Sequence, residues 1–213
     1  MTTALHLKEL AETHAMVVPL TVDQYHEMIA AGILAEGEPI ELLDGMLVRK
    51  DRSKAGEDPM TVGHQHAWVL AQIQDLLPEI NKRGGRLRIQ QPITLPPDSE
   101  PEPDAAIALA KPGDYVDAHP RADEISCVIE VADSSRQRDR ITKQRIYADH
   151  GIGQYVIINL VDGVLEEHRE PRPGTGRYGT QRTYHRDESI SLSVGKSQQL
   201  HVPVATLLPP LAP

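Results

Sequence analysis

The sequence of 213 residues predicts an α/β (α+β) fold in which a mixed β-sheet is flanked by helices. Apolar residues recur at helical spacing from Val69 to Ile80. Two short apolar runs, 125–131 and 154–160, are typical of strands that are covered on both faces. The segment between these runs can form a helix. If the two strands are parallel, this strand-helix-strand order implies a right-handed crossover.

The N-terminal part is expected to form a helix and a hairpin. Residues 21–24 match a capping box, which predicts a helix over about residues 22–31. Asp44-Gly45 lies between the apolar segments of 39–48, and this dipeptide favours a tight hairpin turn because it tolerates positive φ. The following stretch, 51–59, is interpreted as a polar loop.

A long core helix is predicted from about residue 61 to residue 82, and Gly84-Gly85 ends its apolar pattern. Pro78 lies inside this span and cannot donate a backbone hydrogen bond, so the helix should kink there or end near Leu77. The other expected elements are strands at 86–95 and 104–110, a helix at 139–150, antiparallel strands at 164–169, 178–185 and 189–194 with a hairpin turn at 169–173, and an apolar tail at 202–208.

Composition supports one folded domain over residues 1–213. Hydrophobic residues make up 39% of the chain and charged residues 25%, which is enough apolar material for a core. Aromatic residues make up only 3%, which argues against base-stacking platforms. The net charge of -9 argues against tight, non-specific DNA binding, although a local patch can differ from this average.

The sequence carries no sign of export or of a membrane segment. The N-terminus lacks a basic stretch followed by an apolar run, and no apolar run approaches the roughly 18 residues of a membrane span. We therefore expect a cytoplasmic protein without a membrane partner. The single cysteine, Cys127, lies in an apolar run and is expected to be a core residue.

Two acidic residues are candidate metal ligands. Asp104 begins one expected strand and Glu130 lies near the end of the next, so the two can face one another if those strands are neighbours. Magnesium prefers oxygen ligands and keeps several waters, and two carboxylates plus a substrate phosphate suit it. A carboxylate in an apolar strand such as that of Glu130 needs either a metal or a cationic partner, and both explanations are open.

Lys143 shares a helical face with Asp139 and Tyr147, four residues away on either side. If Tyr147 packs toward the sheet, Lys143 can reach Glu130, where its amine could orient or deprotonate a water and stabilise charge on phosphate. A surface ion pair between Asp139 and Lys143 is the alternative, and the helix alone favours it.

Ten sequence features occur together in order. They are Glu41-Leu42-Leu43-Asp44-Gly45, His66, Pro103-Asp104, Val128-Ile129-Glu130-Val131, Ser134-Ser135, Asp139, Lys143, Tyr147-Ala148, Gly151-Ile152 and Gln154-Tyr155. This pattern resembles the Uma-type restriction endonuclease family within the PD-(D/E)XK nuclease superfamily, over about residues 20–171.

The resemblance implies a restriction-endonuclease-like fold and roles for five residues. Asp104 and Glu130 would be metal-binding acids, the Val131 carbonyl a further ligand, Lys143 the catalytic lysine and Glu41 an accessory acid. Three positions depart from the pattern. Ala132 stands where the general motif has its lysine, so that Lys143 must substitute. Val156 and Asn159 replace a frequent Trp and Asp, and these two changes affect local packing more than catalysis.

Two alternatives concern the candidate site. Glu41 could be an outward strand residue beside the hairpin. His64 and His66 could indicate a zinc site. However, two imidazoles that are two residues apart at the start of a helix point in different directions, and no further His-rich motif follows. A role for His66 at the helix terminus or facing the substrate is favoured over zinc.

The leading functional hypothesis is a magnesium-dependent endonuclease that hydrolyses DNA phosphodiester bonds, with manganese as a substitute metal. A homodimer is expected because cleavage of a duplex requires two cuts. The competing hypothesis is a non-catalytic, oligomeric binding module with the same fold, which the net acidity favours.

Overall fold

The computed structural model describes residues 18–35, 37–49, 63–111, 113–132 and 137–210, with the backbone alone for 137–140. The polar loop expected at 51–59 and the expected first residues of the long helix lie outside this part of the chain.

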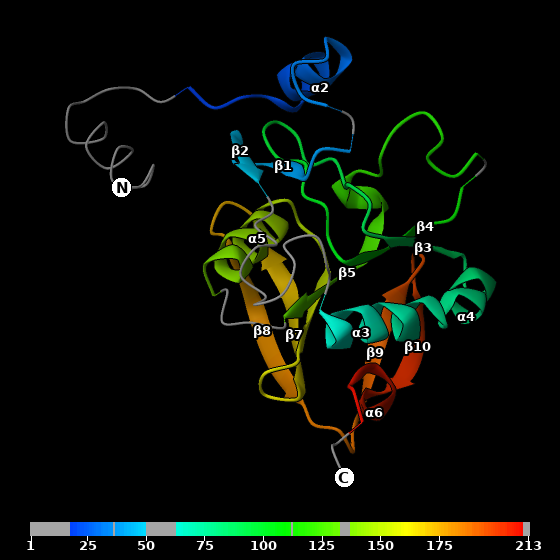
Figure 1. Cartoon of the computed structure of the whole chain (residues 1–213). Coiled ribbons are helices and arrows are strands. Elements are labelled where there is room, and N and C mark those ends of the chain that lie inside the picture. The colour runs from blue at the N-terminus through cyan, green and yellow to red at the C-terminus, as the bar shows by residue number, and fades with distance from the viewer. Residues whose placement is uncertain (1–17, 36, 50–62, 112, 133–136, 211–213) are drawn as a thin grey trace.

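A six-stranded sheet forms the centre of the protein (Figure 1). Strands β5 and β6 pair in parallel, and every other pair of neighbours in this sheet is antiparallel, which confirms the expected mixed sheet. In spatial order, the strands are β3 (Gly85–Ile89), β4 (Ala105–Leu109), β5 (Ile125–Ala132), β6 (Gln154–Asn159), β7 (Val164–Arg172) and β8 (Arg177–Tyr184).

Helices cover both faces of this sheet. On one face, α3 (His64–Gln74) packs Val69 and Ile73 into a cluster that also contains Ile129 of β5. On the other face, α5 (Gln137–Asp149) packs Ile146 and Tyr147 into a second cluster. The apolar residues of β5 from Cys127 to Ala132 divide between the two clusters, which explains why most residues of this strand are apolar.

The predicted break in the long helix is present. Helix α3 ends at Gln74, and a separate helix, α4 (Leu77–Lys82), follows. Pro78 lies at the start of α4, where a missing N–H costs no helical hydrogen bond.

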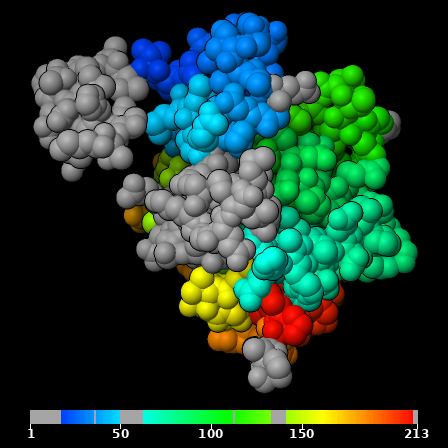
Figure 2. Space-filling model, viewed as in Figure 1, coloured from blue at the N-terminus to red at the C-terminus, as the bar shows by residue number. Residues whose placement is uncertain are grey.

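The N-terminal helix and hairpin are also confirmed. Helix α2 (Val22–Ala30) has the capping box, and Asp44 and Gly45, with φ of 50° and 72°, form the turn between β1 (Ile40–Leu43) and β2 (Met46–Arg49). In α2, Tyr25 packs beside Leu42 of β1 and donates to the Ile40 carbonyl oxygen at 3.1 Å. This unit lies at one end of the molecule (Figure 2).

Near the C-terminus, β9 (Ser189–Val194) and β10 (Gln198–Pro203) form an antiparallel pair, followed by α6 (Val204–Leu207). Both strands pack in the cluster beneath α3, and α6 contacts α3 directly (Figure 2). The expectation of only an apolar tail after 194 was therefore incomplete. Polar Gln198 and Gln199 begin β10 and are both exposed, so they gave no apolar signal.

Two other expected boundaries were wrong. The strand expected over 86–95 ends at Ile89, because Gln90 has φ of 48° and leaves the extended conformation. The turn expected at 169–173 begins later, since Pro171 lies within β7 and pairs with Tyr178. Among the described residues, no helix combines the length and apolar character that crossing a membrane requires.

Candidate active site

The strand register brings Asp104 and Glu130 together. Ala105 of β4 pairs with Ile129 of β5, so Asp104 and Glu130 are the next residues outward on neighbouring strands. The Val131 N–H donates to Asp104 Oδ2 at 2.8 Å. Although 27 positions separate them in sequence, Asp104 and Val131 are therefore joined directly.

Lys143 extends from α5 into the same site. Its Nζ lies 3.1 Å from Oε1 of Glu130, 3.3 Å from Oε2 of Glu41 and 3.5 Å from the carbonyl oxygen of Glu102. An ammonium group has three protons to donate, and here it faces three acceptors. Lys143 thus bridges α5, β5 and β1, and the chain brings it into contact with both Glu130 and Glu41.

Glu41 is an inward residue and not an outward one. It lies in β1, is 6% exposed, and its Oε2 accepts from the Glu102 N–H at 3.0 Å. This bond links the hairpin to the segment that leads to Asp104. The hairpin therefore supplies one wall of the site.

Tyr147 holds Glu130 from the same helix. Its hydroxyl donates to Oε1 of Glu130 at 2.9 Å, on the oxygen that Lys143 also contacts. Lys143 and Tyr147 are four residues apart, so a single face of α5 supplies both. The described residues place no hydrogen-bond donor on the other oxygen of Glu130, Oε2.

His66 reaches the site from the opposite helical layer. Its Nε2 lies 3.0 Å from Oδ1 of Asp104, and its side chain is 14% exposed. The site thus lies where α3, on one face of the sheet, and α5, on the other, meet at the ends of β4 and β5.

The three carboxylates and the lysine perturb one another. Burial raises the pKa of Glu130 to about 7 even though Lys143 opposes this shift, and the charges of Asp104 and Glu41 raise it further. Burial would lower the pKa of Lys143, but the surrounding carboxylates more than offset it and raise this pKa above its usual value. Lys143 therefore carries its proton at neutral pH.

Asp104 behaves differently from Glu130. Burial alone would raise its pKa, but the hydrogen bond and charge of His66 and the Val131 N–H hold this pKa below its usual range. Asp104 is consequently ionised at neutral pH. Three carboxyl groups, those of Glu130, Glu41 and Asp104, thus surround the ammonium of Lys143.

The oxygen atoms of the site suit a hard cation. The Ala132 carbonyl accepts from Leu160, on the β6 side of β5, whereas the Val131 N–H points toward Asp104. Since the N–H and C=O of a strand residue point to the same edge, the Val131 carbonyl also faces Asp104. Among the described residues, no three His, Cys, Asp or Glu side chains are grouped to hold a metal by themselves.

Sequence reasoning found most of this arrangement but undervalued two residues. His66 was assigned a role at the helix terminus or facing the substrate, without a contact to Asp104, and Tyr147 was treated only as a packing residue. The spacing of Tyr147 from Lys143 indicated a shared face, but nothing in the sequence indicated that His66 meets Asp104. The side chain of Asp139, which was expected to pair with or orient Lys143, lies outside the described residues.

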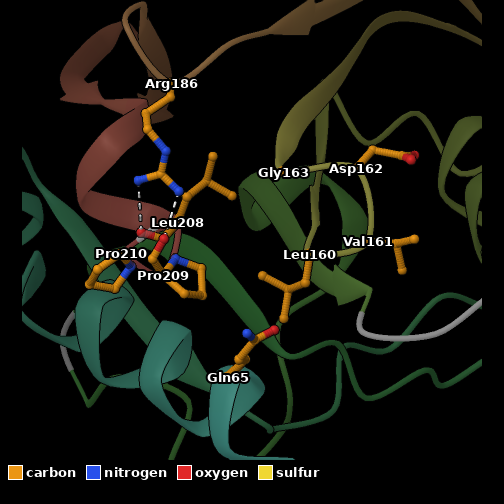
Figure 3. Close-up of a pocket in the computed structure, with 9 residues that line it drawn as sticks. All are labelled: Gln65, Leu160, Val161, Asp162, Gly163, Arg186, Leu208, Pro209 and Pro210. Carbon is orange, nitrogen blue, oxygen red and sulfur yellow. Dashed lines mark hydrogen bonds between the residues drawn. The ribbon is translucent and has the colours of Figure 1, made fainter. Parts of the chain in front are cut away.

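A surface pocket of about 290 Å³ lies elsewhere (Figure 3). Gln65, Asp162 and Arg186 are among its lining residues, and the acidic residues and lysine of the site are not. Arg186 turns toward the C-terminal segment and donates to the carbonyl oxygens of Leu208 and Pro209. These two contacts hold the Arg186 guanidinium against the main chain of the C-terminal segment.

Comparison with known proteins gives two findings. The profile of the Uma2 family, described as "Putative restriction endonuclease", matches residues 22–205. The fold is similar to that of a protein from Anabaena variabilis ATCC 29413 whose crystal structure is described as that of "a putative nuclease belonging to DUF820". The two chains are 17% identical, with a TM-score of 0.64, over 89% of this chain and 97% of the other. No curated protein matches this chain.

Proposed function

Since the chain belongs to the Uma2 family, described as "Putative restriction endonuclease", we propose that it is a metal-dependent endonuclease that hydrolyses phosphodiester bonds of DNA. The observation that supports this proposal most directly is the convergence of Asp104, Glu130 and Lys143 from β4, β5 and α5. Two acids and a protonated amine within one buried site are the groups that phosphoryl chemistry requires.

Magnesium or manganese fits the donor atoms of the site. Asp104 and Glu130 provide carboxylate oxygens, and the Val131 carbonyl faces the same space. Magnesium accepts few protein ligands and completes its shell with waters and substrate phosphate, so two carboxylates and a main-chain carbonyl suit it. A closed zinc site, in contrast, needs more nitrogen or sulfur ligands. The bound ion would polarise phosphate and lower the pKa of its water.

Lys143 acts in this proposal through its charge. Because neighbouring carboxylates raise its pKa, Lys143 carries a proton at neutral pH in the metal-free site, which favours a role as a cation over a role as general base. Its ammonium instead stabilises negative charge that develops on the phosphate. Glu41 keeps the ammonium in place beside Glu130.

The proposal is tested by incubating supercoiled plasmid DNA with the protein and Mg²⁺ or Mn²⁺. We expect cleavage by the wild type and its loss in Asp104→Ala and Lys143→Ala, with circular dichroism confirming that both variants fold. Lys82→Ala is the matched control, since Lys82 is a surface lysine on α4 that is 69% exposed. Equal activity in the wild type and both site variants would exclude the proposed site.

A second candidate is a non-catalytic, oligomeric binding module with the same fold and without a DNA substrate. The net charge of -9, with acidic residues in excess at the site itself, favours this alternative. A homodimer suits either function. Light scattering determines the oligomeric state, and an oligomeric wild type that neither cleaves nor binds DNA with either metal would favour the binding module.

A further inference from the structure

We propose that His66 is a positioning residue, which fixes the carboxylate of Asp104 so that this group can bind the metal ion. The inference rests on the metal site of the proposed function and assigns it a supporting residue on α3. It concerns how Asp104 is held, and it does not make His66 a metal ligand.

The geometry is that of a carboxylate held from two sides. His66 Nε2 lies 3.0 Å from Oδ1, while the Val131 N–H donates to Oδ2 at 2.8 Å. One contact comes from a helix on one face of the sheet, and the other comes from the main chain of β5. Together they determine both the position and the rotation of the Asp104 carboxylate.

The direction of the His66 hydrogen bond follows from the charge of Asp104. An ionised carboxylate only accepts hydrogen bonds, so Nε2 must carry the hydrogen and donate it. Each carboxylate oxygen has two acceptor positions, and His66 and Val131 occupy one on each oxygen. Within the part of the chain that the structure describes, acceptor positions therefore remain on Asp104 for a cation.

The burial of this pair makes it rigid. The side chains of His66 and Asp104 are 14% and 16% exposed, and His66 lies on the helix whose Val69 and Ile73 are fully buried in the core. A hydrogen bond in such surroundings is stronger than one in water. Partners of this kind orient ligating groups, and their loss typically weakens metal binding by about 10- to 100-fold.

A matched pair of variants isolates the hydrogen bond. His66→Gln keeps an N–H donor, whereas His66→Met has a similar size and no donor. His64→Ala is the control on the same helix, because the side chain of His64 is exposed. Mn²⁺ affinity is measured for all proteins by the electron paramagnetic resonance signal of free Mn²⁺, and thermal unfolding confirms that each variant folds.

We expect the Kd for Mn²⁺ to rise about 10-fold or more in His66→Met, to be largely restored in His66→Gln and to be unchanged in His64→Ala. Equal Mn²⁺ affinity of His66→Met and the wild type would overturn this inference and leave the proposed metal site standing. A magnetic coupling between bound Mn²⁺ and a nitrogen nucleus that is present in the wild type and lost in both His66 variants would identify His66 as a direct metal ligand. That result would also overturn the inference. An absence of Mn²⁺ binding by the wild type would overturn the proposed metal site together with this inference.

Discussion

Nζ of Lys143 lies 3.1 Å from Oε1 of Glu130, across 13 positions of sequence that carry the chain from the end of β5 into α5. The lysine of the site thus comes from the helix, while position 132, two residues after Glu130, is a buried alanine. Lys143 can reach the site from the helix because β5, α5 and β6 form a parallel strand-helix-strand unit, in which the helix packs back over the strand that it follows.

Replacing Lys143 by Met should destabilise the protein. The variant leaves Glu130 and Glu41 facing one another without their shared cation, and loss of one partner from a buried ion pair costs about 3 to 5 kcal/mol. Chemical denaturation at pH 8 measures this change. The double variant Glu130→Gln, Lys143→Met should recover most of the lost stability, and strict additivity of the two changes would argue against direct coupling.

Glu130→Gln should make the metal-free protein more stable at high pH. Burial raises the pKa of Glu130 from 4.5 to about 7, so the folded state binds a proton more tightly than the unfolded state between these values. The stability of the wild type therefore falls as pH rises from about 4.5 to 7, and the variant lacks this contribution. Denaturation at pH 5 and pH 8 measures the free energy of unfolding of both proteins. The same difference between variant and wild type at the two pH values would refute this explanation.

Tyr147→Phe removes a hydroxyl that donates to Glu130 and leaves the buried ring in place. We expect a loss of about 1 to 3 kcal/mol in the free energy of unfolding and a weaker affinity for Mn²⁺. Tyr178→Phe is the control, since the Tyr178 hydroxyl donates to the Ile152 carbonyl outside the site. If both variants changed Mn²⁺ affinity equally, the effect would be one of general stability and not of the Glu130 contact.

Gly45→Ala should disturb the hairpin that carries Glu41. A Cβ at Gly45 would lie 2.2 Å from Cβ of Pro19, and its φ of 72° is unfavourable for a residue with a side chain. At Gly32, φ is 69° but nothing lies within 4 Å of the added Cβ. Gly32→Ala should therefore lower the free energy of unfolding by about 1 kcal/mol, and Gly45→Ala should lower it by more than that. Thermal unfolding of both variants measures the two changes.

Local sequence patterns were sufficient for the elements whose signal is local. The capping box at Thr21 and Gln24 fixes the start of α2, Asp44-Gly45 fixes the hairpin turn, and Pro78 accounts for the break before α4. The ends of strands were misjudged where they depend on tertiary contacts, as β3 and β10 show. The end of β3 at Ile89 follows from the positive φ of Gln90, which no local pattern predicted. The residues of β10 adopt a strand because they pair with β9.

The sequence by itself determined the chemical types available to the site, which are the acids Asp104, Glu130 and Glu41 and the amine of Lys143. Only the tertiary structure decided their partners. Register between β4 and β5 joins Asp104 to Val131, and packing of α3 against the opposite face brings His66 to the same carboxylate. Spacing along one helix can reveal that Lys143 and Tyr147 share a face, but contacts between separate layers depend on how the whole core packs, and no local pattern encodes that.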